Sequence, residues 1–200
     1  MHQFKKLIVG LVLLSTPAFI SAQAFADGTN LVFIGFGLPP GSKLTQSYDP
    51  NPNFSDYKLN NYGTGVLKYE HGLHKYFGIG LNFEYSAANG SYNYNYYGNS
   101  TEYNNSVSRS VFGAYLRMNG HYPIGDKVDI YGGVGLGYLY TVDKVADNTP
   151  GANDSHKNAV LNFDEQVTIG ARFMVKNSFG VFGEVGYATT ACQVGIVMKF

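Results

Sequence analysis

Few residues in this 200-residue chain have the type and spacing that metal binding or catalysis needs. His71 and His74 lie three residues apart beside Glu70, a spacing that occurs in metal sites, but the segment is predicted to be a tight turn without a second cluster of ligands. An Asp-Ser-His run occupies residues 154–156, whereas the members of a catalytic triad come from separate parts of a chain. We therefore expect no catalytic residue, no metal site and no cofactor, and treat both groups as solvated turns or loops.

Two further candidates also favour a structural role. Cys192 is the only cysteine, so no intrachain disulfide can form, and we expect it to be a small apolar residue on an outward face. His121 is expected on an inward face as a hydrogen-bonded histidine. No glycine-rich loop follows a strand and precedes a helix, which leaves nucleotide binding without support.

The composition excludes several classes of protein. Charged residues make up 14% of the chain, against about 25% in an ordinary soluble domain. The formal net charge is zero, so the basic excess of a nucleic-acid-binding protein is missing. Aromatic residues make up 16%, which argues against disorder, and no apolar run is long enough for a membrane-spanning helix. A β protein rich in glycine and tyrosine remains.

Residues 1–24 are predicted to be a signal peptide. Lys5 and Lys6 precede an unbroken apolar run over residues 7–14, and small residues follow that run. The A-x-A cleavage pattern fits residues 22–24 and also residues 24–26. The chain is therefore expected to be exported, with residues 25–200 as one domain if cleavage follows Ala24, and with cleavage after Ala26 as the alternative.

A two-residue period predicts strands. Residues 77–86 alternate without error between one face with Phe77, Ile79, Leu81, Phe83 and Tyr85 and an opposite face with Gly78, Gly80, Asn82, Glu84 and Ser86. The last ten residues alternate in the same way, and similar runs begin near Asn30, Tyr62, Ser110, Val128, Leu161 and Phe179. The pattern predicts eight strands, each with one apolar face.

The connections between these strands alternate in length. Long polar segments over residues 39–61, 87–107 and 142–158 alternate with short turns at residues 71–75, 123–127 and 176–178, and a short link over residues 188–190 precedes the last strand. This order fits an all-β, eight-stranded antiparallel up-and-down transmembrane β-barrel with short periplasmic turns and long external loops.

A soluble barrel of the lipocalin kind would also alternate, with its apolar face inward. The polar face decides against it because many of its positions are glycine, among them Gly78, Gly80, Gly133, Gly135, Gly137, Gly170, Gly180, Gly186 and Gly195. Glycine weakens a water-facing strand, whereas the crowded interior of an eight-stranded barrel needs small residues. We therefore expect the polar face inside and the apolar face toward lipid.

The end of the chain resembles that of small outer-membrane β-barrels of the opacity-protein, OmpX-like and OmpW-like families. The resemblance lies in residues 182–187 and 194–200, and the run at residues 131–138 resembles a strand of these barrels. It implies residence in the outer membrane of a Gram-negative cell, contact with outer-membrane lipid and lipopolysaccharide, and insertion by the barrel assembly machinery. The signal that this machinery would recognise is Val194, Ile196, Met198 and Phe200. The chain departs from the families in having no tryptophan for its aromatic girdles.

Charged residues of both signs are predicted to point into the barrel. By parity they are Lys68, Glu70, Glu84, Arg109, Arg117, Asp129, Arg172, Glu184 and Lys199. We expect an interior network of ion pairs that fills the lumen, with Arg172 near Glu184 and Glu84 near Arg117. A narrow path for an ion or a small solute is the alternative, although eight strands leave room only for side chains or one small ligand.

The segment of residues 87–107 is rich in tyrosine and asparagine, which favour adaptable contact surfaces. A surface-contact loop would use Tyr92, Tyr94, Tyr96, Tyr97 and Tyr103. The alternative interpretation is an extension of the strands with tyrosines at the lipid headgroups.

Three functions follow as hypotheses. The first is a structural or surface-interaction barrel that binds an extracellular surface ligand through its long external segments and has no catalytic activity. The second is a narrow channel for small or apolar solutes across the outer membrane. The third, a lipid-modifying enzyme, needs a histidine with a serine or an acid at the external rim, and the external halves of the predicted strands contain no histidine. We expect the first function, with the second as the alternative.

Overall fold

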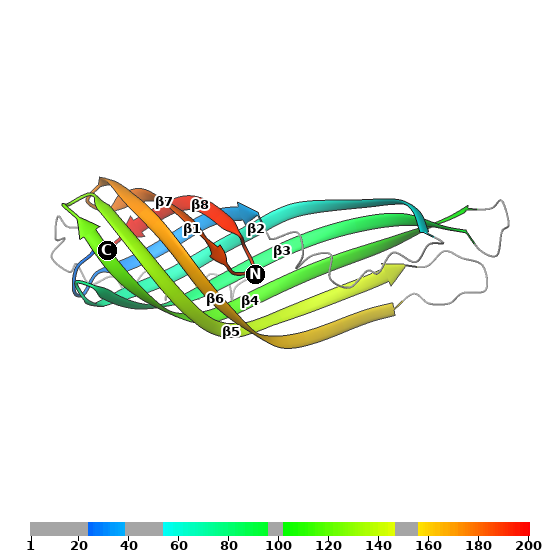
Figure 1. Cartoon of the computed structure of the whole chain (residues 1–200), viewed down its shortest axis with the longest axis horizontal. Helices are drawn as coiled ribbons and strands as arrows, with labels where there is room; N and C mark the ends of the chain where they lie inside the picture. The colour runs from blue at the N-terminus through cyan, green and yellow to red at the C-terminus, as the bar shows by residue number, and fades with distance from the viewer. Residues whose placement is uncertain (1–23, 39–53, 96–101, 147–155) are drawn as a thin grey trace, which may run out of the picture.

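Eight antiparallel strands close into one barrel in the computed structural model, which describes residues 24–38, 54–95, 102–146 and 156–200 (Figure 1). The strands are β1 (Asn30–Leu38), β2 (Phe54–His74), β3 (Phe77–Asn95), β4 (Glu102–Ile124), β5 (Val128–Ala146), β6 (His156–Lys176), β7 (Phe179–Tyr187) and β8 (Cys192–Lys199). Each strand pairs with the next, and β8 pairs with β1. The prediction of an eight-stranded antiparallel up-and-down barrel is confirmed. Among the described residues, no helix has the length and apolar character needed to cross a membrane.

The strands differ in length, and this difference shapes the molecule. β2 to β6 have 19 to 23 residues, whereas β1, β7 and β8 have 8 or 9. The pairing of β1 with β2 stops at Thr64, and that of β7 with β6 stops at Val167. β2 to β6 therefore continue beyond the closed barrel as an open sheet, at the end opposite the short turns (Figure 1). We call residues 54–63, 87–95, 102–110, 142–146 and 156–159 the projecting sheet.

The projecting sheet corrects the expectation of long loops. Much of the sequence assigned to loops over residues 39–61, 87–107 and 142–158 continues the strands. β3 and β4 pair without a register shift from Phe77 and Gly120 to Asn95 and Glu102. Because a single-layered sheet has no core to cover, its strands do not need an apolar face, and the alternation that identified the barrel strands is missing there.

The two faces of the barrel are inverted relative to a water-soluble protein. Inward side chains are largely polar or charged and buried, whereas outward side chains are large, apolar and exposed. The exposed apolar positions form a belt around the barrel that includes Ile34, Leu67, Leu81, Phe83, Leu116, Val134, Leu136, Ile169, Val181 and Ile196. This arrangement follows from the period of two in each strand.

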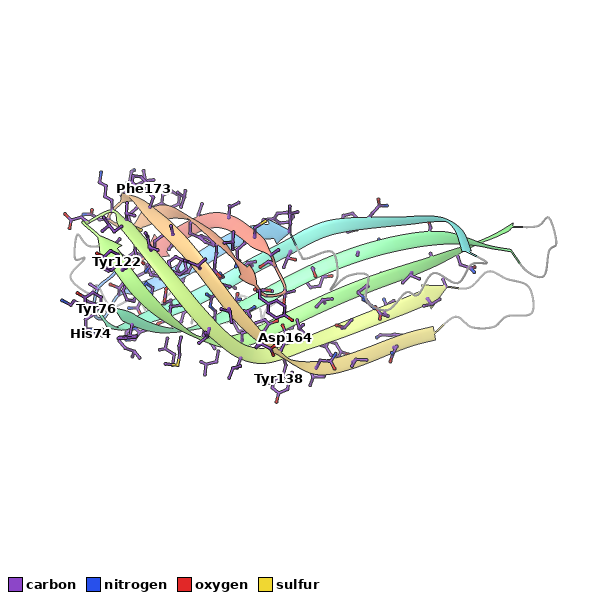
Figure 2. All side chains as sticks on the ribbon, viewed as in Figure 1. His74, Tyr76, Tyr122, Tyr138, Asp164 and Phe173 are labelled. Carbon is purple, nitrogen blue, oxygen red and sulfur yellow. The ribbon has the colours of Figure 1, made fainter. Side chains whose placement is uncertain are left out.

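Exposed aromatic side chains border this apolar belt on both sides. Near the short turns they are Tyr76, Phe77, Tyr122, Phe173, Phe179 and Phe200, and near the projecting sheet they are Tyr62, Tyr85, Phe112, Tyr138, Tyr140, Phe163 and Tyr187. Figure 2 shows Tyr76, Tyr122 and Phe173 at the short-turn end, and Tyr138 where the long strands leave the closed barrel. Two aromatic girdles of this kind flank the apolar band of a transmembrane barrel.

Glycines on the inner face make room for larger neighbours. Gly35 of β1 is the direct partner of Gly195 of β8, and the ring of Phe182 on β7 lies over both. A Cβ atom on Gly35 would lie 2.8 Å from Cζ of Phe182, and one on Gly195 would lie 2.7 Å from Cε1 of the same ring. The close packing of Phe182 against β1 and β8, the strands that close the barrel, therefore requires glycine at both positions.

The substitution Gly195→Val is expected to lower the free energy of unfolding by about 1–3 kcal/mol, because the added atoms collide with Phe182 and with the Ile34 carbonyl. Urea titration of the protein in detergent micelles, followed by circular dichroism, measures the change. Gly132→Val is the control: Gly132 is exposed, and the nearest atom to its new Cβ would be 3.7 Å away. Equal losses in the two variants would contradict the packing argument.

Candidate functional site

The lumen is the candidate site because charged side chains from most of the strands converge there. Strand alternation directs Lys68 and Glu70 of β2, Arg117 of β4, Arg172 of β6 and Glu184 of β7 inward, and all five are buried. Their charges are arranged in clusters stacked along the barrel axis, from the short-turn end toward the projecting sheet.

The first cluster, at the short-turn end, is centred on Arg172. Its guanidinium nitrogens lie 3.2 Å from Oε2 of Glu70 and 2.6 Å from Oδ2 of Asp129. His121 links the same two carboxylates, with Nε2 2.8 Å from Oε1 of Glu70 and Nδ1 2.9 Å from Oδ2 of Asp129. Asn119 donates a further hydrogen bond to Oε1 of Glu70 over 2.6 Å. Each carboxylate is thereby shared between a guanidinium and an imidazole, which offsets the loss of hydration on burial.

Aromatic rings enclose the Arg172 guanidinium. Its central carbon lies 4.9 Å from the ring centroid of Phe25, 5.4 Å from that of Tyr131 and 5.7 Å from that of Phe33. These are cation–π distances, so the guanidinium combines its ion pairs with contacts to three aromatic rings.

The second cluster is centred on Glu184, whose carboxylate receives two cations. Nζ of Lys68 lies 2.7 Å from Oε2, and Nη1 of Arg117 lies 2.8 Å from Oε1. Tyr131 donates to Oε2 over 3.2 Å, and Gln193 donates to Oε1 over 3.0 Å. Four donors on two oxygens thus satisfy this buried carboxylate, and two of them carry a positive charge.

The third cluster has amides in place of cations. Oε1 of Glu84 accepts hydrogen bonds from Nδ2 of Asn82 at 2.7 Å and from Nε2 of Gln166 at 3.0 Å. Asn82 also donates to Oε1 of Gln166 over 3.0 Å, so side chains of β3 and β6 meet across the lumen. Amide side chains thus join opposite walls of the barrel.

Polar contacts also close the lumen where the barrel opens into the projecting sheet. Tyr115 donates to Oδ2 of Asp164 over 2.8 Å, and its hydroxyl lies 2.8 Å from that of Thr189 in the link between β7 and β8. Farther out, Arg109 makes two contacts with Asp143, at 2.6 and 2.7 Å. Figure 2 shows Asp164 near the place where the closed part ends.

Little space is left between the first and second clusters. A cavity lined by Lys68, Glu70, Arg117 and Glu184, among others, has a volume of about 10 Å³. That volume is close to the minimum that holds a single water molecule. The arrangement therefore suits a rigid polar core better than a path for solutes.

Of the nine charged residues predicted to face inward, the structure places eight in buried positions, and Arg109 is half-buried beside Asp143. The predicted pairs differ from those observed. Arg172 contacts Glu70 and Asp129, although Glu184 is at the diagonal position that suggested a pair. Arg117 contacts Glu184, while Glu84 is bound by two amides. The Arg172–Asp129 pair follows from the register of β5 and β6, in which the two residues are direct partners. The Arg172–Glu70 and Arg117–Glu184 pairs join strands that are not neighbours, so they do not follow from neighbouring registers.

The sequence did not single out three residues that lie in the lumen, and it did not indicate the role of a fourth. Tyr131 and Gln166 have the inward parity, so the period could have identified them. His121 was expected to be hydrogen-bonded inside, as it is, but not to bridge two carboxylates. Phe25 lies before the first strand, and no sequence signal placed it in the lumen.

The remaining predicted residues lie apart from the lumen. Among the tyrosines of the surface-contact segment, Tyr92 and Tyr94 are on β3 and Tyr103 is on β4, with Tyr94 opposite Tyr103, whereas Tyr96 and Tyr97 are outside the described residues. Of the predicted assembly signal, Val194, Ile196 and Phe200 are exposed and Met198 is half-buried.

The histidine candidates do not form a metal site in the described part of the chain. His71 contacts Asn30 at 2.8 Å, and His74 is near the ring of Tyr76. No group of three or more His, Cys, Asp or Glu side chains among the described residues could hold a metal ion. Of residues 154–156, the first two are outside the described residues and His156 begins β6.

Comparisons with known proteins identify the fold. No protein-family model matches the chain, and no curated protein matches it either. The outer membrane protein OprG of Pseudomonas aeruginosa has a TM-score of 0.52 at 10% identity, over 88% of this chain and 97% of OprG.

Two further solved barrels are similar over most of their length. The N-terminal β-barrel domain of Pseudomonas aeruginosa OprF matches with a TM-score of 0.47 at 9% identity, over 88% of this chain and 99% of that domain. Ail, the attachment invasion locus protein of Yersinia pestis, in complex with the heparin analogue sucrose octasulfate, matches with a TM-score of 0.47 at 13% identity, over 86% of this chain and 95% of Ail. At such identities the similarity concerns the fold alone, and the fold is that of small eight-stranded outer-membrane β-barrels, as the sequence resemblance implied.

Proposed function

We propose that this protein is an integral β-barrel of the outer membrane of a Gram-negative cell, and that it binds an extracellular ligand through its projecting sheet without catalysing a reaction. The observation that carries the proposal is the inverted barrel: charges fill the lumen, and an apolar belt between two aromatic girdles covers the outside. Such a surface would be unstable in water, whereas it matches the hydrocarbon and headgroup regions of a bilayer.

The projecting sheet supports the surface-interaction role. It continues from the barrel end that carries the long connections, which in transmembrane barrels of this kind is the extracellular end. Within the described residues, β2 has no strand partner on its outer edge before Thr64, and β6 has none before Val167 on the side of β7. A strand edge without a neighbouring strand, as over residues 54–62 of β2 and 156–166 of β6 in the described part of the chain, can offer backbone donors and acceptors to a partner.

The filled lumen supports a non-conducting barrel. The Arg172, Glu184 and Glu84 clusters span the lumen in succession, and their ion pairs and hydrogen bonds cross the path that a solute would take. In planar bilayers the purified protein should therefore show no stepwise current. Reproducible single-channel steps that disappear on heat denaturation would instead support the channel.

The binding role is tested by shortening the β3–β4 hairpin. Residues 90–107 are replaced by Asn-Gly, which keeps the register because Gly90 pairs with Val107. Cells that display the full chain should adhere to surfaces coated with laminin, fibronectin or collagen more than cells that display the shortened variant. Both forms should migrate faster on gels unboiled than boiled, which shows that the barrel is intact. Equal adherence of the two forms would contradict a role for the projecting sheet, and absence of the gel shift would contradict the barrel.

A further inference from the structure

Phe25 lies inside the barrel although it precedes the first strand. Its side chain is fully buried at the short-turn end, in one apolar cluster with Leu31, Phe33, Met174 and Phe182, and Ala24 is buried in the same cluster. Its ring stacks on the imidazole of His121, with centroids 3.6 Å apart and planes inclined by 19°. The central carbon of the Arg172 guanidinium lies over the same ring, 4.9 Å from its centroid. Phe25 thus lies against the first charged cluster.

Two glycines form the seat of this ring. A Cβ atom on Gly78 would lie 3.1 Å from Cζ of Phe25, and one on Gly72 would lie 3.2 Å from the same atom and would collide with the carbonyl oxygen of Ala26. A larger residue at Gly72 would collide with the backbone of Ala26, and one at Gly78 would meet the Glu70 carboxylate at 2.6 Å, and either would require the Phe25 ring to shift by a few tenths of an ångström.

A compact turn directs the segment into the lumen. Ala26 donates to Oγ1 of Thr29 over 3.1 Å, and Thr29 donates to the Ala26 carbonyl over 3.2 Å. Gly28, with φ of 72°, donates to the Gly72 carbonyl over 2.9 Å, and Gly72 donates to the Thr29 carbonyl over 2.8 Å. The turn is therefore tied to β2 on both sides, which fixes the position of Phe25.

The position of Phe25 distinguishes the two cleavage patterns in the sequence. Cleavage after Ala26 would remove the ring and leave the glycine seat and the His121 ring uncovered. Cleavage after Ala24 would remove only the Ala24 methyl group from the same cluster, and it would retain the ring, with its contacts to His121 and Arg172, as the first residue of the mature chain. A signal peptidase acts on the exported chain before the barrel folds, so burial of Phe25 in the folded protein does not prevent the cut.

We propose that a signal peptidase hydrolyses the Ala24–Phe25 bond, and that Phe25, as the N-terminal residue, closes the short-turn end of the lumen over His121 and Arg172. Water supplies the hydroxyl that converts the Ala24 carbonyl to a carboxylic acid and the proton that the Phe25 nitrogen takes up. The inference rests on the proposed outer-membrane barrel, because that role supplies the export pathway. Its function is a seal: an apolar ring separates the buried ion pairs from water at the short-turn end.

The cleavage position is tested by intact-mass spectrometry of the protein purified from outer membranes. The expected mass is that of residues 25–200, and the mass of residues 27–200 would overturn the proposal. The Ala22→Leu variant disrupts only the first A-x-A pattern and should give either unprocessed chain or a chain that starts at Asp27. Normal cleavage after Ala24 in this variant would show that residues 22–24 do not direct the cut.

The seal is tested with Phe25→Ala, and Phe77→Ala, an exposed phenylalanine at the same end, is the matched control. In solution NMR spectra of the micellar protein, the His121 ring protons should move downfield in Phe25→Ala, because the ring current of the stacked phenylalanine is lost. The amide protons of Gly28 and Gly72 should also exchange faster with solvent. Unchanged His121 signals and exchange rates, with the gel shift of the intact barrel retained, would overturn the seal without affecting the proposed membrane role.

Discussion

Replacing Arg172 with methionine should lower the free energy of unfolding by about 3–5 kcal/mol, because it leaves two buried carboxylates without their guanidinium partner. Arg172 is 1% exposed and joins Glu70 to Asp129. Methionine has a similar length and can occupy much of the same space, so the loss measures the charge more than a cavity. A shift of the urea midpoint in detergent micelles, followed by tyrosine fluorescence and circular dichroism, gives the value.

Two controls make this result specific to the lumen. Lys157→Met removes a cation from an exposed position on β6, and it should change stability by less than about 0.5 kcal/mol. The triple variant Arg172→Met, Glu70→Gln and Asp129→Asn removes the unpaired charges together and should recover part of the loss. An Arg172→Met protein as stable as the parent would show that the ion pairs at the short-turn end do not hold the barrel together.

Introducing arginine at Val134 should destabilise the membrane-inserted barrel by about 2–4 kcal/mol, since it places a charge on the lipid face near the bilayer centre. Val134 is 56% exposed on β5, between Ile130 near one aromatic girdle and Tyr138 in the other. The measurement is the unfolding free energy in phospholipid vesicles, with the gel shift as a test of assembly.

Asn158→Arg is the matched control because Asn158 is exposed on β6 within the projecting sheet. If that sheet stands outside the bilayer, arginine there should have little effect. Equal losses at positions 134 and 158 would show that the apolar belt is not what contacts lipid. A barrel that functions in water would gain or lose little from either charge.

Much of the fold could be predicted because the apolar belt imposes a period of two on the strands inside it. Residues 77–86 show this period in full, and they form the first half of β3, which lies in the closed barrel. The same strand continues to Asn95 through residues such as Asn89 and Ser91, which have no apolar alternation. The apolar belt, and not strand formation itself, produced the alternating pattern. The segments over residues 39–61 and 142–158 were therefore assigned to loops, whereas the strand extension considered for residues 87–107 agrees with β3 and β4.

The lumen could be predicted as a set of residues but not as a network. Parity indicates which side chains face inward, yet Lys68 meets Glu184 across 116 positions of sequence and from opposite sides of the barrel seam. Such a contact depends on how strands tilt and stagger around the ring, which fixes the depth of each residue along the axis. Neighbouring registers, from which Arg172 was paired with Glu184, contain no information about depth across the lumen.

The seam between β1 and β8 has a consequence for the order of assembly. Asn30 and Phe200 exchange backbone hydrogen bonds of 2.9 and 3.4 Å, so the first and last strands complete the ring together. Contacts of such large sequence separation form slowly, because nearly the whole chain must be ordered before they can form. Until that step, β1 and β8 each have an open edge, and the glycine pair that Phe182 covers is exposed. A folding catalyst would be most useful at this seam. There the late pairing of β1 with β8 converts a curved sheet with two unpaired strand edges into a closed ring.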